Sequence, residues 1–316
     1  MNTKSKLLTL LAVSSGTAAT IAAINKGIQI SATSKNILKL PESLCYNWHL
    51  GNIHYTKTGN GNPVLLLHDL TSASSGYEWH DLIPKLALDH TVYTIDLLGC
   101  GRSEKPNMTY TNYLYVQLVS DFIKNIIGHR TDMIVTGASS PIAIMACSQN
   151  PDLFNRLLCI NPDSLLSCSQ TPNKQSKILK LILDCPLIGT LLYNMNTCRQ
   201  TLEETIAKEY YCNPYSMKSA DVDSYYEAAH LGGSPKSVYS SIQCNYVKCN
   251  IVNALKKIDN SIYLVGGEAV PHIAEQMNEY KIYNPAIETV LIPNTKYLPQ
   301  LEDPDALFQV ISTYFF

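Results

Sequence analysis

The sequence of 316 residues has no run of lysines or arginines beyond its first residues, and its formal net charge is only −2. Nucleic-acid binding requires clustered positive charge that neutralises phosphates, so we expect no nucleic-acid partner. The sequence also lacks internal repeats and low-complexity segments. Its length suffices for one large domain with an inserted subdomain, and we expect a monomer.

Metal-ligand and disulfide patterns are missing as well, although the chain has ten cysteines. Cys244 and Cys249 are separated by four residues and have no neighbouring histidine or second cysteine pair, so we expect no zinc site. Cys147 and Cys159 lie inside apolar segments, where cysteine behaves as a small hydrophobe. Many free thiols favour a reducing, cytoplasmic environment, and nothing indicates a cofactor.

The first 30 residues carry the clearest targeting signal. Residues 7–24 hold no charge and follow Lys4 and Lys6. As a helix this stretch would be about 27 Å long, against a hydrocarbon core of about 30 Å, so we predict a single-pass membrane anchor within residues 1–30. A signal peptide cleaved near Ala22 is the alternative. Lysines on both sides leave the orientation open.

From about residue 50, short apolar runs alternate with amphipathic stretches, which is typical of strands and crossover helices in an α/β sheet. The predicted strands are Gly51–Thr58, Pro63–Leu67, Thr91–Leu97, Met133–Thr136, Leu157–Ile160, Ser261–Val265 and Thr289–Ile292. The predicted helices around them are Glu78–Leu88, Tyr110–Ile127, Ile142–Ser148 and Pro304–Phe316.

The segment between the fifth and sixth of these strands has helical patterns and no strand of the buried type. The predicted helices are Lys174–Asp184, Leu187–Tyr193, Leu202–Tyr211, Ala220–His230 and Lys236–Tyr246. We therefore predict a doubly wound, mostly parallel α/β sheet formed by residues 40–164 and 255–316, with an all-helical lid inserted over residues 165–254.

The most specific motif is Ile-Asp-Leu-Leu-Gly-Cys-Gly-Arg-Ser at residues 95–103. It resembles the strand-end loop, of the form DLxGxGxS, of the α/β-hydrolase superfamily in its lid-bearing branch. The two glycines allow a tight backbone path, and Arg102 is available to fix the loop by hydrogen bonds. We expect this loop to be structural rather than catalytic.

The resemblance implies that Ser139, within Gly-Ala-Ser-Ser-Pro at residues 137–141, is the candidate nucleophile. In this family the nucleophile occupies a strained turn between a strand and a helix, where small neighbours expose the hydroxyl. The alternative is that Ser139 or Ser140 only caps the helix that begins near Pro141.

The same resemblance implies that the backbone N–H groups of Leu70 and Ser140 form the oxyanion hole. His68 and Asp69 precede Leu70, directly after a predicted strand. Asp69 stands where relatives have glycine, which brings a carboxylate near the developing negative charge and disfavours ordinary ester chemistry. We expect His68 to support the loop.

The two remaining triad positions are degenerate by the same comparison. Tyr297 stands at the histidine position, and Val270 stands at the acid position. Tyrosine, with a pKa near 10, is a poor base at neutral pH. Loss of the base alone costs on the order of a millionfold in turnover in a serine protease.

Four other residues are candidate substitutes for the missing partners. His272 and His230 could act as the base, and Glu268 and Asp163, which follow predicted strands, could act as the acid. Each of these residue types is more often a surface or capping residue.

These observations predict a membrane-tethered α/β-hydrolase-family protein with a lidded pocket for a small apolar ester or acyl ligand. Because its triad is incomplete, we expect a weak, atypical or inactive hydrolase. The alternative is an active serine hydrolase of the esterase or lipase type that uses Ser139 with a substitute base. Different chemistry in the same pocket is a third possibility, since a fold does not fix a function.

Overall fold

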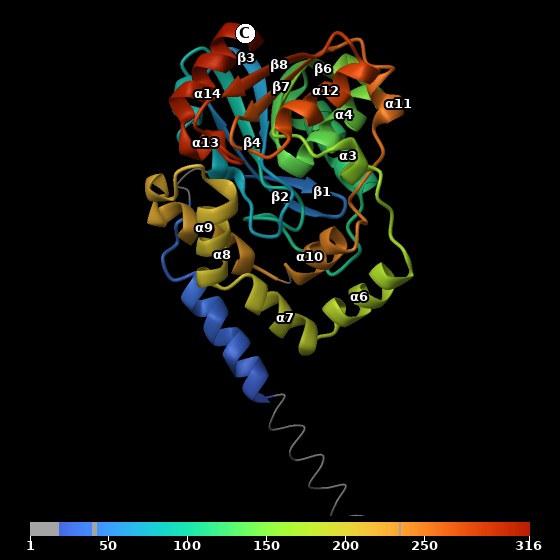
Figure 1. Ribbon diagram of the computed structural model, residues 1–316. Coiled ribbons are helices and arrows are strands. Elements are labelled where there is room, and N and C mark those ends of the chain that lie inside the picture. Colours follow the sequence, from blue (N-terminus) through green and yellow to red (C-terminus); the bar gives the residue numbers. More distant parts are fainter. Residues whose placement is uncertain (1–18, 40–42, 234) are drawn as a thin grey trace, which may run out of the picture.

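The computed structural model describes residues 19–39, 43–233 and 235–316. Eight strands form one sheet in the order β1-β2-β4-β3-β5-β6-β7-β8 (Figure 1). β2 pairs antiparallel with β1 and β4, and every neighbouring pair from β4 to β8 is parallel. The strands are β1 Leu44–Trp48, β2 Gly51–Thr58, β3 Asn62–Leu67, β4 His90–Ile95, β5 Thr131–Thr136, β6 Phe154–Ile160, β7 Ser261–Gly267 and β8 Glu288–Ile292.

Helices cover both faces of this sheet, and each face has its own apolar core (Figure 1). On one side pack α3 (Asn112–Phe122), α4 (Ser140–Gln149) and α12 (Ile273–Tyr283). On the other side pack α2 (Ile83–Leu86) and α14 (Pro304–Val310). Further short helices are η1 Gly76–Trp79, η2 Ile123–Ile127, η3 Gly137–Ser139, η4 Pro151–Leu153, α13 Pro299–Glu302 and η7 Ile311–Phe315.

The central strands are apolar throughout because both of their faces are buried. Along β3, Leu65 and Leu67 join one core while Val64 and Leu66 join the other. This explains why the predicted strands are found within a few residues of their expected bounds. β1 was not predicted, because it is an edge strand whose residues, apart from Trp48, retain solvent exposure.

Two helices differ from the sequence-based expectation. The helix predicted over 78–88 is divided into η1 and α2, because Pro84 cannot donate a backbone hydrogen bond and lies in the first turn of α2. α12 was not predicted at all. Its buried residues Ile273, Met277 and Tyr280 are few and lie among polar side chains.

The helical insertion, residues 165–254, lies between β6 and β7. Its described residues, which leave out position 234, contain no strand. This confirms the predicted all-helical character. Its helices are α5 Leu165–Cys168, α6 Lys174–Asp184, α7 Ile188–Asn196, α8 Arg199–Thr205, η5 Ile206–Tyr210, η6 Pro214–Ser216, α9 Ser219–His230, α10 Lys236–Gln243 and the start of α11 Val252–Leu255.

A further helix, called the N-terminal helix, includes residues 19–32 and leaves the body beside the insertion (Figure 1). Asn194 Nδ2 donates to Asn25 Oδ1 at 2.6 Å, and Lys35 Nζ pairs with Asp223 Oδ2 at 2.6 Å. Most of the anchor predicted for residues 7–24 lies outside the described residues. Within the described part, no single helix has both the length and the apolarity needed to cross a membrane.

Candidate functional site

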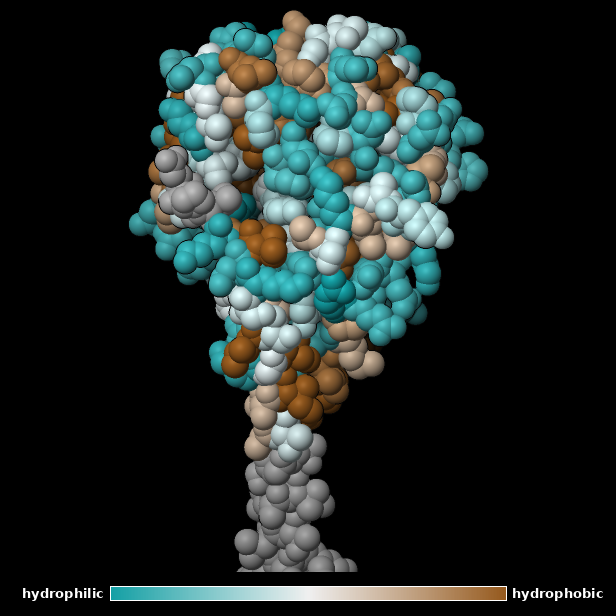
Figure 2. Space-filling model, turned by 90° about the vertical axis from the view of Figure 1, so that its left-hand side faces the viewer, coloured by the Kyte–Doolittle hydropathy of each residue, from teal (hydrophilic) through white to brown (hydrophobic). Residues whose placement is uncertain are grey.

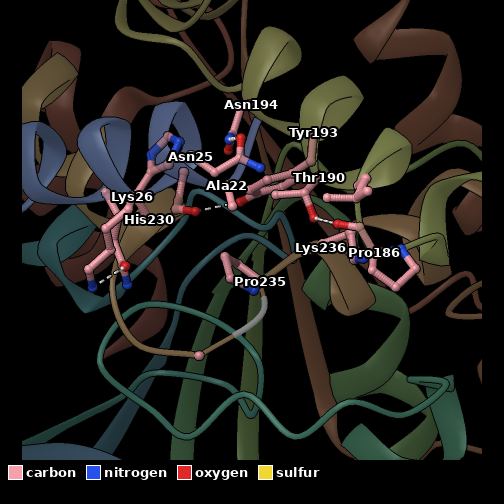
Figure 3. A pocket seen from close by; sticks show the side chains of 14 residues that line it. Ala22, Asn25, Lys26, Pro186, Thr190, Tyr193, Asn194, His230, Pro235 and Lys236 are labelled. Atoms are coloured by element: carbon pink, nitrogen blue, oxygen red, sulfur yellow. Dashed lines mark hydrogen bonds between the residues drawn. The ribbon is translucent and has the colours of Figure 1, made fainter. Parts of the chain in front are cut away.

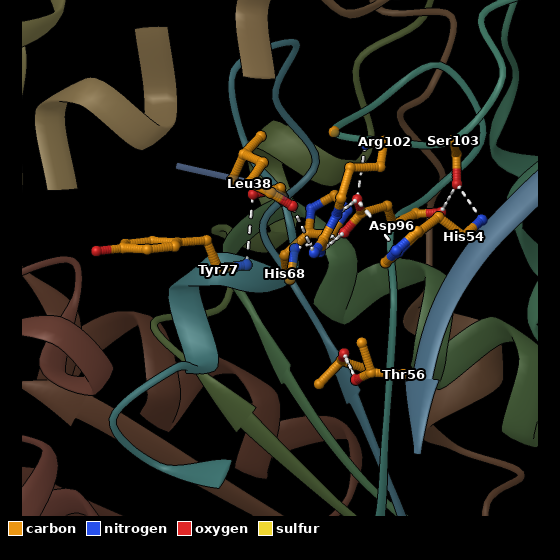
Figure 4. Close-up of polar contacts among 12 residues, drawn as sticks. Leu38, His54, Thr56, His68, Tyr77, Asp96, Arg102 and Ser103 are labelled. Carbon is orange, nitrogen blue, oxygen red and sulfur yellow. Dashed lines mark hydrogen bonds and ion pairs between the residues drawn. The ribbon is translucent and has the colours of Figure 1, made fainter. Parts of the chain in front are cut away.

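The motif loop after β4 is fixed by a buried ion pair (Figure 4). Asp96 accepts hydrogen bonds from Gly76 N at 2.7 Å and from Arg102 N, Nε and Nη2 at 2.7, 2.7 and 2.9 Å. Burial alone would raise the pKa of Asp96, but the charge and hydrogen bonds of Arg102 hold it below its usual range. Gly101 has a φ of +48°, and a Cβ there would collide with the Asp96 carboxylate. The loop is therefore a structural element.

His68 has both ring nitrogens engaged within the core. Its Nε2 accepts the Leu97 N–H at 3.0 Å, so its Nδ1–H donates to the carbonyl oxygen of Asp69 at 2.6 Å. Burial lowers the pKa of His68, which keeps the ring neutral. His68 holds two loops of the sheet edge together, as expected from the sequence.

The turn between β5 and α4 is strained at Gly137 rather than at Ser139. Gly137 has a φ of +57°, whereas Ser139 is helical with φ −77° and ψ −17°. Ser139 is fully buried, and its Oγ donates to the carbonyl oxygen of His68 at 2.6 Å. Its side chain also makes no cap to α4. The strained conformation expected at Ser139 is thus wrong, and the alternative, a helix cap, does not hold for Ser139.

The carboxylate of Asp69 fills the space beside this turn. Asp69 Oδ1 accepts the Ala138 N–H at 2.8 Å, and the Leu70 N–H also stabilises this carboxylate, which lowers its pKa. A Cβ at Gly137 would collide with the same carboxylate. The other expected oxyanion donor, Ser140 N–H, donates instead to the carbonyl oxygen of Gly137.

Asp69 is linked to a second buried carboxyl group, Glu78. Glu78 Oε2 accepts the Asp69 N–H at 3.1 Å, and Glu78 Oε1 accepts the hydroxyl of Tyr225 at 2.9 Å. Burial, with a smaller contribution from the Asp69 charge, raises the pKa of Glu78 to about 8. Burial also raises the pKa of Asp69 to about 6, against the lowering effect of the Ala138 N–H. Near neutral pH, Asp69 is therefore mostly ionised and Glu78 mostly protonated.

The two positions expected to hold the triad partners lie as follows. Tyr297 is 40 % exposed, and its backbone N–H donates to Tyr210 O at 2.9 Å. Burial of its ring, together with the charge of Asp163, raises the pKa of Tyr297, so even less of its deprotonated, basic form is present at neutral pH. Val270 is buried in the core and donates its N–H to Gly267 O.

The four substitute candidates have other surroundings. Asp163 Oδ2 pairs with Lys248 Nζ at 2.5 Å. His230 is buried, with Nδ1 bonded to the carbonyl oxygen of Tyr226 at 2.8 Å. His272, at the start of α12, and Glu268, after β7, are exposed. The hydroxyl of Ser139 has the His68 carbonyl as its partner, and none of these side chains.

A cavity of about 290 Å³, called the inner cavity, lies between the loop after β3 and the helical insertion. Aromatic and aliphatic side chains alternate in its wall with hydroxyl and amide groups. Its lining residues are Thr71, Ser72, Ala73, Asn196, Thr197, Thr201, Leu202, Thr205, Ile206, Tyr210, Tyr225, Tyr239, Ile242 and Gln243.

Tyr225 connects the inner cavity to the carboxyl pair, because its hydroxyl bonds to Glu78. Glu78 and Tyr225 were missed from the sequence. They belong to no motif, and only the packing of η1 against α9 brings them together. Asp69 was noticed for its charge, but its position between two backbone N–H groups could not be read from the chain.

Comparisons with known proteins agree with this architecture. A profile described as "Alpha/beta hydrolase family" matches residues 64–310. Soluble epoxide hydrolase from Corynebacterium sp. (strain C12) is 31% identical over 109 residues, which are 34% of this chain and 37% of that protein. A 2-hydroxy-6-oxo-6-(2'-aminophenyl)hexa-2,4-dienoic acid hydrolase from Metapseudomonas resinovorans is 38% identical over 71 residues, which are 22% of this chain and 24% of that protein.

Solved structures resemble nearly the whole described fold. The epoxide hydrolase CorEH superposes with a TM-score of 0.72 at 20% identity, over 87% of this chain and 98% of that chain. A membrane phospholipase A superposes with a TM-score of 0.68 at 16% identity, over 97% of this chain and 95% of that chain. At these identities the likeness concerns the fold alone, and the aligned curated relatives are matched over about a third of their length or less.

Proposed function

Because the chain belongs to the alpha/beta hydrolase family, we propose that it keeps the fold and a lidded ligand cavity but has lost Ser-His-Asp turnover. One observation carries this proposal: the carboxylate of Asp69 accepts a hydrogen bond from the Ala138 N–H group at 2.8 Å and is also stabilised by the Leu70 N–H group. In this fold, an N–H after the third strand and the N–H following the nucleophile bind the reaction's oxyanion. In this protein the carboxylate of Asp69 occupies the place of that oxyanion.

The conformation of the turn supports the same conclusion. The nucleophile of an α/β-hydrolase sits on the strained strand-to-helix turn, and here the left-handed residue of that turn is Gly137. Glycine offers no nucleophilic side chain. Ser139 lies two residues further on, inside the core, with its hydroxyl already donated to a carbonyl oxygen.

Electrostatics disfavours turnover even if another nucleophile attacks. A tetrahedral intermediate develops negative charge, which the oxyanion hole must stabilise. The pKa of Asp69 is about 6, so at neutral pH a negative charge already occupies the two donors. Tyr297 and Val270 stand in place of the catalytic base and its orienting acid, so the usual residues for proton transfer are missing. The usual charge stabilisation is missing too, because a carboxylate occupies the oxyanion donors.

The inner cavity supports a binding role for the helical insertion as a lid. Its volume is at the small end of the range typical of ligand sites, and it is a partly open space between the insertion and the loop after β3. Its mixed wall fits a small ligand that has an apolar body and one hydrogen-bonding group. A small, mostly apolar ester or acyl compound, the ligand class expected from the sequence, has this composition.

The test is labelling of the full chain with a fluorophosphonate probe, beside Ser139→Ala and an active serine hydrolase as a positive control. We expect neither form of this protein to be labelled. Labelling that disappears in Ser139→Ala would establish an activated Ser139 and the active-enzyme alternative. Labelling that persists in Ser139→Ala would reveal another activated serine and equally contradict the proposal.

A further inference from the structure

The helical insertion exposes an apolar surface at the end of the molecule where the N-terminal helix leaves it (Figure 1, Figure 2). α6 and α7 supply this surface, here called the apolar face. Its side chains are between 37 % and 74 % exposed. They are Ile178, Leu181, Ile182, Ile188, Leu191 and Met195. On each helix these residues recur three or four positions apart, so each helix presents an apolar stripe to solvent.

The shape of this surface matches a membrane interface better than a membrane span. α6 and α7 together have the length and hydropathy of a span, but they are bent by 97°. Such a pair cannot cross a bilayer as one rod. It can lie in the interface, with its apolar side chains among the acyl chains and its polar side toward the protein.

The position of the N-terminal helix identifies the bilayer as the occupant of the apolar face. The uncharged residues 7–24 lead into this helix, and Asn25 is hydrogen bonded to Asn194 of α7. Exposed Lys26, Lys174 and Lys177 lie on the elements that form or border the face, where lysines can contact lipid phosphates. The described part of the predicted anchor, residues 19–24, and the apolar face therefore lie at the same end of the molecule (Figure 1).

A groove of about 360 Å³ opens between the N-terminal helix and α7 at this end (Figure 3). Ala22, Asn25, Lys26 and Gln29 form one wall, and the insertion forms the other, with Thr190 and His230 among its residues. The groove thus lies beside the surface that would rest on the lipid.

A thin wall separates this groove from the inner cavity. Tyr193 lines the groove, and its ring packs against Tyr239 of the inner cavity at 5.3 Å between centroids. Thr197 of the inner cavity lies 3.5 Å from His230 of the groove, measured from Oγ1 to Nε2. One layer of side chains therefore divides the two spaces. Tyr193 is buried in this layer and its hydroxyl donates to Ala229 O at 2.6 Å, so opening the wall requires that this hydrogen bond break.

We propose that the apolar face rests on a phospholipid bilayer and that the groove admits a single-chain lipid from that bilayer to the inner cavity. This proposal rests on the ligand-binding role above and adds the class of ligand and its route. A single-chain lipid has an apolar tail and one polar head. These match the apolar face beside the groove and the mixed wall of the inner cavity. No covalent step is involved.

Contact with the bilayer is tested by tryptophan quenching in the full chain. Leu181→Trp places a fluorophore on the apolar face, and Ile282→Trp places one at a similarly exposed apolar site on α12. The native Trp48 and Trp79 are buried and form a constant background. In vesicles of brominated phosphatidylcholine with some phosphatidylglycerol, we expect strong quenching for Leu181→Trp and little for Ile282→Trp. Equal quenching, or none, overturns the docking.

The route is tested with a diazirine-bearing fatty acid in the same vesicles, with crosslinked peptides mapped by mass spectrometry. We expect crosslinks to inner-cavity segments around Tyr239 in the unmodified chain. Ala22→Trp, which fills the groove, should lower these crosslinks several-fold, and Ala23→Trp, next to it but outside the groove lining, should not. Absence of inner-cavity crosslinks in the unmodified chain overturns the ligand class. Equal crosslinking in both variants overturns the route.

These results are independent of the fluorophosphonate experiment. Labelling of Ser139 would overturn the loss of turnover, while quenching at position 181 would still support the bilayer contact. Absence of both labelling and quenching would leave the proposed loss of turnover intact and overturn the membrane proposal alone.

Discussion

At the scale of single residues, Asp69 and Gly137 define this site together. The carboxylate takes the space that a side chain at position 137 would need, and the left-handed backbone at 137 suits glycine. The absence of a side chain at Gly137 therefore leaves room for the Asp69 carboxylate. Their coupling is a direct measure of how firmly the carboxylate occupies the turn.

A double-mutant cycle measures this coupling. We expect Gly137→Ala to lower the free energy of unfolding by about 1–3 kcal/mol, from the positive φ and from the collision with Asp69. In an Asp69→Gly background the same change should cost less, because the collision is gone, with a coupling energy of about 0.5–3 kcal/mol. Urea unfolding of the four proteins provides the values. Strict additivity would mean that the Asp69 carboxylate does not occupy the space beside Gly137.

Glu78 gives the protein a pH-dependent stability of known sign. Its folded-state pKa of about 8 lies above its ordinary value, so the folded protein binds this proton more tightly than the unfolded chain does. The contribution is fully present below about pH 4.5 and is lost as the pH rises through about 8. Over that range one proton gives a slope of up to about 1.4 kcal/mol per pH unit.

Comparison of the unmodified chain with Glu78→Gln isolates this proton. We expect the fall in unfolding free energy above about pH 6.5 to flatten in Glu78→Gln, and Glu275→Gln, at an exposed site, to leave it unchanged. Below about pH 6.5 the buried His54, whose pKa burial lowers to about 4, contributes with the opposite sign. Denaturant titrations across this range provide the slopes. Identical slopes in all three proteins would show that Glu78 ionises normally when folded.

At the scale of elements, loops at the carboxyl edge of the sheet are held by buried polar groups in addition to apolar contacts. The loop after β4 depends on the Asp96–Arg102 pair, whose side chains are 0% and 11% exposed. The loop after β3 depends on His68, and η1 depends on Asp96 and Glu78. Loss of one partner should therefore disturb several elements together.

Arg102→Leu tests this dependence. It leaves the Asp96 carboxylate buried without its counter-charge, so we expect a loss of about 3–5 kcal/mol in the free energy of unfolding. The double variant Asp96→Asn with Arg102→Leu should lose less. Lys208→Met breaks a pair whose side chains are 74% and 52% exposed, and about 0–1 kcal/mol is expected there. Equal losses for Arg102→Leu and Lys208→Met, measured by urea unfolding, would contradict this account.

At the same scale, the accuracy of the sequence-based prediction follows from burial. Strands such as β3 and β5 were predicted because both faces are buried and their residues are continuously apolar. α12 and β1 were missed because each has only a few buried side chains, which leaves a weak pattern. Helices of the insertion were predicted where one face is apolar, although their ends moved by a few residues.

At the scale of the whole molecule, two ends have different characters. One end is the sheet and its covering helices, with apolar cores on both faces. The other end is the insertion with the N-terminal helix, where apolar side chains remain in solvent (Figure 2). A large exposed apolar surface marks an interaction site, and here it adjoins the groove between the N-terminal helix and α7.

The sequence by itself determined the family and the order of the buried central strands, and it supplied the prediction that Tyr297 and Val270 stand at the histidine and acid positions. These properties depend on local periodicity and on short motifs, which are written along the chain. Only the tertiary structure decided which residue carries the strained φ and what fills the space beside it. β3 and β5 are neighbours in the sheet, so Asp69 meets a turn 68 positions later in the chain. No local sequence pattern encodes this contact between Asp69 and Gly137, because it depends on the register of two strands and on a single backbone angle.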